Sequence, residues 1–397
     1  MNLFKKYENL KSEDYMSIAD PSWPSFEIFI THQNIPENIY NEVDTMLNLE
    51  KFDDPAFCIL PFIGVEYPAC SFCCISTSSN RKDTQQKMLN GNRPECCLVC
   101  WNQEDAGSKS DRQIKNSTYD FYTGNLIDLY KQVKVDSNIP MQYYKIDSTI
   151  TCNATCVTCS PDSSSAWVAL FKKNNLPVTH KKIDLSKFDV DYKNAKAISF
   201  RGGEPFYSDK NFQILETLIK ENNTDCFISF VTNGSVWPTA QQLNIIKQFP
   251  NLSIGMSLDG HENVFEYVRY PLKWNDILEN INKWRESIPH AKLSVQYTLS
   301  NLNVFYYTDT IKWFEKNNLP YSINPVTGPA YFQVGVLPDR VKDIIRQKTE
   351  SNEVLRLLDI HLPELYDKFL NEIKKQDAMK GIQIQSYLTE LSTLLDI

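Results

Sequence analysis

Short apolar runs alternate with amphipathic stretches between residues 143 and 326, and this alternation limits the chain to few folds. The apolar runs predict strands over 143–149, 197–200, 227–232, 252–258, 293–299 and 321–326. The stretches between them predict helices over 163–175, 208–222, 238–248, 273–287 and 305–317. Strands that alternate with helices form a parallel sheet with right-handed crossovers. Six such units predict an α/β fold built on an open (β/α)6 barrel, two units short of a closed one.

Three further segments flank this barrel, which we place at residues 141–330. Residues 1–50 are polar and aromatic, with a helix predicted over 36–49 and no assignable role. Residues 51–140 hold seven cysteines, many turn formers and little periodicity. A loop-rich unit of this kind buries too little core to fold alone, which indicates a domain held together by metal. Residues 331–397 are rich in Leu, Lys and Glu and predict a C-terminal helical extension.

Hydropathy and charge restrict the location and the partners of the protein. No run of eighteen apolar residues occurs in the 397-residue chain, so the sequence predicts no membrane span and no membrane partner. The N-terminus has charges but no apolar core, unlike a signal peptide, and we therefore expect a cytoplasmic protein. The formal net charge of −8, without a block of Lys and Arg, argues against a nucleic-acid partner.

Cysteines are the most informative residues for function. Ten of the eleven lie within residues 58–159, and in a chain without an export signal this crowding indicates metal binding. Three follow the first barrel strand with the spacing Cys152-x3-Cys156-x2-Cys159. Three thiolates can hold a [4Fe–4S] cluster and leave one iron open to a small molecule. The alternatives are a zinc ion with a fourth ligand borrowed from elsewhere, or three unrelated buried thiols.

A second motif follows the second barrel strand and reads Arg201-Gly202-Gly203-Glu204-Pro205. Glycines allow the backbone to approach a ligand closely, and the Glu204 carboxylate can accept hydrogen bonds from an ammonium group. By itself this motif is also typical of a simple turn. Its place one β/α unit after the three cysteines makes the functional interpretation much stronger.

These two motifs together resemble the radical S-adenosylmethionine (SAM) superfamily. The resemblance covers residues 143–326 and implies a partial, TIM-like barrel with a [4Fe–4S] cluster whose open iron binds SAM. One electron from the cluster cleaves SAM to methionine and a 5′-deoxyadenosyl radical, which abstracts a hydrogen atom from the substrate. Gly202, Gly203 and Glu204 would hold the amino end of SAM. Ribose and carboxylate contacts are expected at Thr232, Asn233, Ser257, Asp259 and Arg269, each of which has a structural turn or a surface charge as its alternative.

The N-terminal cysteines resemble the twitch module, a shortened relative of SPASM domains that binds an auxiliary [4Fe–4S] cluster. The resemblance lies in Cys-x-Leu-Pro-Phe from Cys58, in Cys-Cys, in Cys-x2-Cys-Trp and in Glu-x2-Gly-x2-Ser-x-Arg from Glu104. It implies the ligands Cys58, Cys73, Cys97 and Cys100. Cys70 or Cys74 could replace Cys73, Cys96 could replace Cys97, and a four-cysteine zinc site is the alternative. Here the module precedes the barrel instead of following it, and Cys226 is expected to be a plain buried residue.

The resemblance implies SAM-dependent hydrogen abstraction from a peptide or peptide-like substrate, such as crosslinking or epimerisation. The auxiliary cluster would relay an electron, act as a structural staple or, with an open iron, bind substrate. An electron donor such as flavodoxin or ferredoxin is the expected partner. Other interpretations are a radical SAM enzyme for a small metabolite or a nucleoside or tRNA, and a non-catalytic iron–sulfur or zinc protein. The sequence singles out no proton or hydrogen donor.

Overall fold

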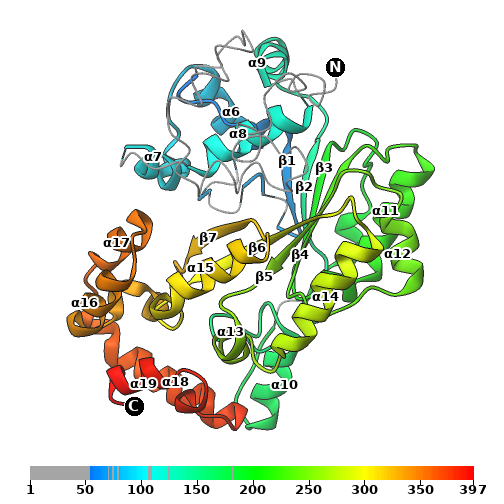
Figure 1. Cartoon of the computed structure of the whole chain (residues 1–397). Helices are drawn as coiled ribbons and strands as arrows, with labels where there is room; N and C mark the ends of the chain where they lie inside the picture. The colour runs from blue at the N-terminus through cyan, green and yellow to red at the C-terminus, as the bar shows by residue number, and fades with distance from the viewer. Residues whose placement is uncertain are drawn as a thin grey trace.

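A seven-stranded parallel sheet forms the centre of the protein. The structure is a computed structural model that describes residues 54–69, 71–73, 76–77, 80–105, 110–123, 126–180 and 182–397. The strands pair in chain order, as Figure 1 shows. Their bounds are Gly64–Tyr67 (β1), Tyr143–Asp147 (β2), Ala197–Arg201 (β3), Phe227–Thr232 (β4), Leu252–Ser257 (β5), Lys292–Leu299 (β6) and Tyr321–Pro325 (β7). The six predicted strands are confirmed as β2 to β7. The additional strand, β1, comes from the cysteine-rich region and pairs with β2.

Helices connect consecutive strands and cover one side of the sheet. Figure 1 shows α11, α12 and α14 lying together beyond the strands. The helices of this part are Ser165–Lys173 (α10), Asp209–Lys220 (α11), Ala240–Ile246 (α12), Glu262–Val268 (α13), Trp274–Ser287 (α14) and Tyr307–Lys316 (α15). Five of them match the predicted helices. The sixth, α13, was not predicted because it is only seven residues long and begins directly after the turn that follows β5.

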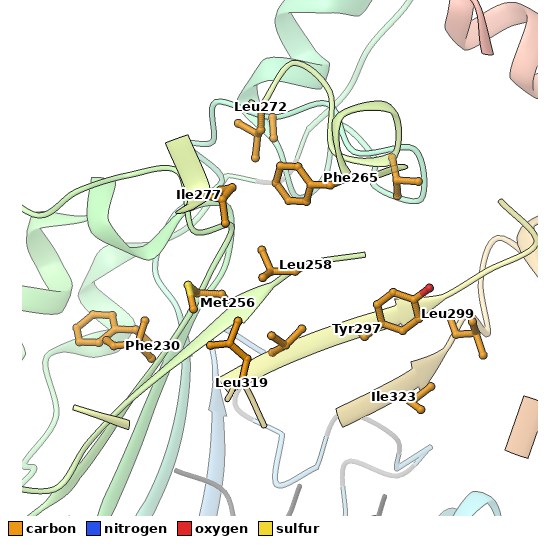
Figure 2. Packing of buried hydrophobic residues seen from close by; sticks show 14 of the residues in the cluster. Phe230, Met256, Leu258, Phe265, Leu272, Ile277, Tyr297, Leu299, Leu319 and Ile323 are labelled. Carbon is orange, nitrogen blue, oxygen red and sulfur yellow. The ribbon is translucent and has the colours of Figure 1, made fainter. Parts of the chain in front are cut away.

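The two faces of the sheet differ sharply in polarity. Side chains alternate between faces along a strand, so one set packs under the helices in the main core. Figure 2 shows Met256 and Leu258 on the same side of the sheet as Ile277 of α14 and Phe265 of α13. The opposite face carries a row of polar residues in direct register, Lys145, Ser199, Ser229 and Ser253. A polar inner face is the side of an open barrel that can receive a polar ligand.

The described part of the cysteine-rich region consists mainly of helices besides β1, contrary to the loop-rich character expected. Its helices are Leu60–Ile63 (α5), Arg81–Leu89 (α6), Leu98–Asp105 (α7), Asp111–Thr123 (α8) and Leu126–Val135 (α9). The prediction was wrong because a helix such as α6 has almost no apolar stripe and buries polar Thr84 and Gln85 beside Met88. A second small core, with Phe57, Trp101 and others, holds these helices together. Residues 1–50, with the helix predicted over 36–49, lie outside the described residues.

The C-terminal extension is helical as predicted. Its helices are Asp339–Lys348 (α16), Asn352–Leu358 (α17), Tyr366–Lys380 (α18) and Thr389–Leu395 (α19). Figure 1 shows α18 near α10, the helix that follows the three barrel cysteines. None of the helices in the described part of the chain has both the length and the apolar character needed to cross a membrane.

Candidate functional site

The three barrel cysteines share one loop, which joins the end of β2 to the start of α10. Cys152, Cys156 and Cys159 are each partly buried, and their thiols are close enough to influence one another electrostatically. Burial raises the pKa of the Cys156 thiol to about 12, against the opposing effect of the Arg269 guanidinium. Burial raises the pKa of Cys159 as well. Thiols in such surroundings keep their protons until a metal centre displaces them.

Hydrogen bonds from a neighbouring segment fix the backbone of this cysteine loop. The N–H of Thr155 donates to the carbonyl of Tyr270 at 2.7 Å, and the N–H of Val157 donates to the carbonyl of Val268 at 2.8 Å. Both acceptors lie at or just after the end of α13. The backbone on both sides of Cys156 is therefore held by the β/α unit that also carries Arg269.

The two glycines of the second motif pack directly against the start of the cysteine loop. The N–H of Gly203 donates to the Thr149 carbonyl at 2.7 Å, and the N–H of Glu204 donates to the Thr151 carbonyl at 2.7 Å. Gly202 has φ of +110°, a region that L side chains rarely adopt, and a Cβ on it would meet the Thr149 oxygen at 2.6 Å. A Cβ on Gly203 would meet the Thr151 oxygen at 2.5 Å. Only glycine allows this contact between the two motifs.

Glu204 connects the second motif to the end of β4. Its carboxylate is fully buried and accepts hydrogen bonds from the Thr232 hydroxyl and from the Asn233 N–H, each at 2.8 Å. Burial raises the pKa of Glu204 to about 7, although both hydrogen bonds oppose the rise. Asn233 continues the chain of contacts, because its amide donates to Asn153 Oδ1 at 2.8 Å and lies 3.8 Å from Cys152 Sγ. Glu204, Thr232 and Asn233 thus form one network that ends at the first cysteine.

Asp259 and Arg269 form a buried ion pair near Cys156, the second cysteine of the loop. Arg269 Nη2 lies 2.7 Å from Asp259 Oδ2, and the Asp259 side chain is 1% exposed. The N–H of Thr298 donates to Asp259 Oδ1 at 2.7 Å and fixes the carboxylate. Arg269 Nη1 lies 3.9 Å from Cys156 Sγ, while its Nε is buried without a hydrogen-bond partner among the described residues. Although burial opposes it, the Asp259 carboxylate raises the pKa of Arg269, so this side chain brings a fixed positive charge to the cysteines.

Apart from Ser257, the predicted SAM contacts therefore fall into two groups, which lie near different cysteines of the loop. The first group touches Cys152 and the second touches Cys156, whereas Ser257 lies at the end of β5, in register with Gln296. Asn153 was missed by the sequence analysis, although its position beside Cys152 was an available signal. No group of three or more His, Cys, Asp or Glu side chains in the described parts of the chain is arranged to bind a single metal ion. Because the ligands of an iron–sulfur cluster bind separate iron atoms, they stand farther apart than the ligands of one ion.

The N-terminal cysteines meet at a separate pocket between α5, α6 and α7. Cys58, Cys73, Cys97 and Cys100 line it together. Burial raises the pKa of Cys58 to about 12 and also raises the pKa values of Cys97 and Cys100. Cys96 is absent from the lining and lies beside Cys97, with 3.8 Å between the sulfur atoms. The rivals Cys70 and Cys74 lie outside the described residues.

The Glu-x2-Gly-x2-Ser-x-Arg motif binds the cysteine segments to one another. Arg112 makes a two-point ion pair with Glu104, at 2.9 and 2.8 Å, and Ser110 donates to the same carboxylate. The Arg112 guanidinium also donates to the Phe57 carbonyl at 2.7 Å and lies over the Trp101 ring. Phe57 precedes Cys58 and Trp101 follows Cys100, so one buried arginine fixes the positions of two cysteines.

Comparison with known proteins finds a family model that matches part of the barrel and several distantly similar solved structures. Residues 146–314 match the model of the radical SAM superfamily. Among solved structures, anSMEcpe with bound AdoMet is 14% identical with a TM-score of 0.37, and the match covers 57% of this chain and 61% of that one. SuiB of Streptococcus suis is 13% identical with a TM-score of 0.35, over 64% of this chain and 58% of that one.

The chain spans less than two thirds of each of these solved chains. No curated protein matches it. The family match includes all three barrel cysteines, the glycine motif and the two groups of side chains around them. This chain therefore contains a radical SAM superfamily domain, which spans residues 146–314.

Proposed function

We propose that this protein is a radical SAM enzyme that holds a [4Fe–4S] cluster on Cys152, Cys156 and Cys159 and binds SAM at the open iron. The observation that carries the proposal is the direct connection of the cysteine loop to the glycine motif. Gly203 and Glu204 donate their backbone N–H groups to the carbonyls of Thr149 and Thr151, just before Cys152, so one unit presents both the cluster ligands and the expected SAM contacts.

The donor set around the loop suits such a cluster. It offers three thiols, the usual ligands of iron–sulfur clusters, at the carboxyl end of a parallel strand, where barrels of this kind place their chemistry. Arg269 adds a buried positive charge 3.9 Å from Cys156, which favours the thiolate form that iron requires. The cluster, when bound, supplies the electron that cleaves SAM to methionine and a 5′-deoxyadenosyl radical.

The two groups of side chains beside the loop would bind SAM. Gly202, Gly203 and Glu204 would take its amino end, with Thr232 and Asn233 holding the Glu204 carboxylate in place. Contacts to the ribose and the carboxylate are proposed for Ser257, Asp259 and Arg269. The SAM carboxylate is proposed to lie near Arg269, because Arg269 Nε is buried without a hydrogen-bond partner among the residues that the structure describes.

We place an auxiliary [4Fe–4S] cluster at Cys58, Cys73, Cys97 and Cys100. The pocket that these four cysteines line together supports this set over Cys96. Arg112 would fix the ligands Cys58 and Cys100 through Phe57 and Trp101. Four thiolates saturate a cubane, so this site would relay an electron or act as a structural staple rather than bind substrate.

The substrate is proposed to be a peptide or a peptide-like molecule. The twitch-like motifs favour this class, and the polar inner face of the sheet fits it. That face carries the ion pairs Lys145–Glu66, at 2.7 Å, and Arg201–Asp147, at 3.3 Å, which can exchange partners with polar groups of a ligand. A small metabolite or a nucleoside would use fewer of these contacts. Flavodoxin or ferredoxin is proposed as the electron donor.

Anaerobic reconstitution with iron and sulfide, followed by SAM and dithionite, tests the proposal. We expect about eight iron and eight sulfide per chain and the release of 5′-deoxyadenosine. Cys156→Ala should abolish this release, whereas Cys226→Ala, a buried cysteine of the main core, should retain it. Zinc at the N-terminal pocket would refute the auxiliary cluster, and intact cubanes without 5′-deoxyadenosine would refute the catalytic role. Deuterium transfer from labelled candidate peptides into 5′-deoxyadenosine tests the substrate class.

A further inference from the structure

Helix α18 of the C-terminal extension contacts the cysteine loop directly. Gln376 Nε2 donates to the carbonyl of Val157 at 3.1 Å, and both residues are buried. Val157 lies between Cys156 and Cys159. A helix more than 200 residues farther along the chain therefore holds the segment that carries two proposed cluster ligands.

Lys380, one turn after Gln376, is fixed at the same place. Its Nζ donates to Gln376 Oε1 at 3.0 Å, and the residue is 8% exposed. The ammonium lies 4.9 Å from the centroid of the Trp167 ring, whose Nε1 donates to the Cys156 carbonyl at 3.0 Å. Both side chains that fix Lys380 thus also bond to the cysteine loop.

Lys380 forms no ion pair with any residue that the structure describes. The nearby Asp377 carboxylate instead accepts from the Tyr267 hydroxyl at 2.9 Å and from the Ile384 N–H at 2.7 Å. Burial lowers the pKa of Lys380 to about 8, while the thiols of Cys156 and Cys159 and two carboxylates, Asp377 and Glu372, oppose the decrease. The side chain therefore remains mainly protonated at neutral pH. A buried ammonium is costly unless negative charge lies nearby.

We infer that the positive charge of Lys380, which Gln376 holds in place, raises the reduction potential of the cluster proposed at Cys152, Cys156 and Cys159. The inference rests on that proposed function. Reduction adds one negative charge to the cluster, and a fixed buried cation stabilises the reduced form more than the oxidised form. The C-terminal extension would then make the cluster easier to reduce before it donates its electron to SAM.

Redox titration followed by electron paramagnetic resonance, without SAM, tests this role apart from cosubstrate binding. Signals of the barrel cluster are assigned as those lost in Cys152→Ala. In Lys380→Met the ratio of reduced to oxidised cluster at a given potential should fall about tenfold, which corresponds to about 59 mV. Lys380→Arg keeps the charge and should stay within about twofold of the wild type. Lys342→Met removes another buried lysine, bonded to the Ile360 carbonyl in the same extension, and should not change the ratio.

An unchanged ratio in Lys380→Met, with iron content and folding intact, would overturn the inference. Lys380→Gln, which can still donate to Gln376, is the second neutral variant. Loss of the cluster from both neutral variants but not from Lys380→Arg supports the need for charge, whereas loss from all three indicates packing alone and refutes it. A wild-type chain without any signal that Cys152→Ala removes would instead refute the proposed function itself.

Discussion

Gly203 lies so close to Thr151 that a Cβ in its place would stand 2.5 Å from the Thr151 carbonyl oxygen. The glycine motif is thus a structural partner of the cysteine loop as well as an expected SAM contact. Its neighbour Glu204 donates its backbone N–H to that same carbonyl. The loop before Cys152 and the turn after β3 can therefore move only together.

Gly203→Ala should separate the two motifs. The added methyl group clashes with backbone, which cannot rotate away as a side chain can, and we expect a loss of about 1–3 kcal/mol in unfolding free energy. Iron bound at the barrel cysteines should fall in parallel. Gly328→Ala is the control, because a Cβ there meets nothing within 4 Å and should change stability by less than about 0.5 kcal/mol. Urea unfolding and iron analysis measure both effects, and equal behaviour of the two variants would contradict the tight contact.

Glu204 should make the stability of the metal-free protein depend on pH. Its pKa is about 7 in the folded chain against 4.5 for the ordinary group, so folding favours the protonated form. Ionisation of the buried Glu204 carboxyl lowers the unfolding free energy. This effect is absent below pH 4.5, grows as the pH rises, and is complete above pH 7. At 1.36 kcal/mol per pH unit this interval corresponds to about 3 kcal/mol.

Comparison with Glu204→Gln isolates this effect from all other titrating groups. The unfolding free energy of the wild type minus that of the variant should fall between pH 4.5 and pH 7.5. The exposed Glu221, replaced by Gln, is the matched control and should give a profile parallel to that of the wild type. A constant difference for Glu204→Gln across this range would show that its carboxyl is not buried as described.

Asp259→Asn should destabilise the fold by about 3–5 kcal/mol, because it leaves the buried Arg269 guanidinium without its carboxylate. The exposed ion pair of Lys283 and Glu279 on α14 provides the control, since breaking a solvated pair by Lys283→Ala should cost less than about 0.5 kcal/mol. Chemical denaturation measures the loss of unfolding free energy in both variants. A small effect for Asp259→Asn would indicate that Arg269 is stabilised mainly by the cysteines.

Arg112→Met should empty the auxiliary site selectively. Its loss leaves the buried Glu104 carboxylate without its ion-pair partner and releases the segments of Cys58 and Cys100, so we expect bound iron to fall from about eight to about four per chain. Arg93→Met is the control: Arg93 also lies over the Trp101 ring, but it is exposed and pairs with exposed Asp105. Iron analysis together with 5′-deoxyadenosine release separates the sites, and retention of all the iron would contradict the role of Arg112.

Much of the barrel could be predicted because its signals are local. Each strand from β2 to β7 is a short apolar run bounded by turn residues, and the glycine motif directly follows one of them. The strand β1 gave no such signal, because its four residues include Gly64 and Glu66 and its pairing depends on β2. The helices of the cysteine-rich region were missed for a related reason, since they bury polar as well as apolar side chains against a small core of their own.

The sequence alone singled out the residues that we propose to bind iron and SAM, because cysteine spacing and glycine placement depend on neighbours in the chain. Only the tertiary structure decided what surrounds them. It brought Arg269 to Cys156 and paired it with Asp259, and it brought Gln376 and Lys380 to a loop more than 200 residues away in the chain. Contacts between distant segments depend on how whole helices pack, and a short motif contains no record of that packing.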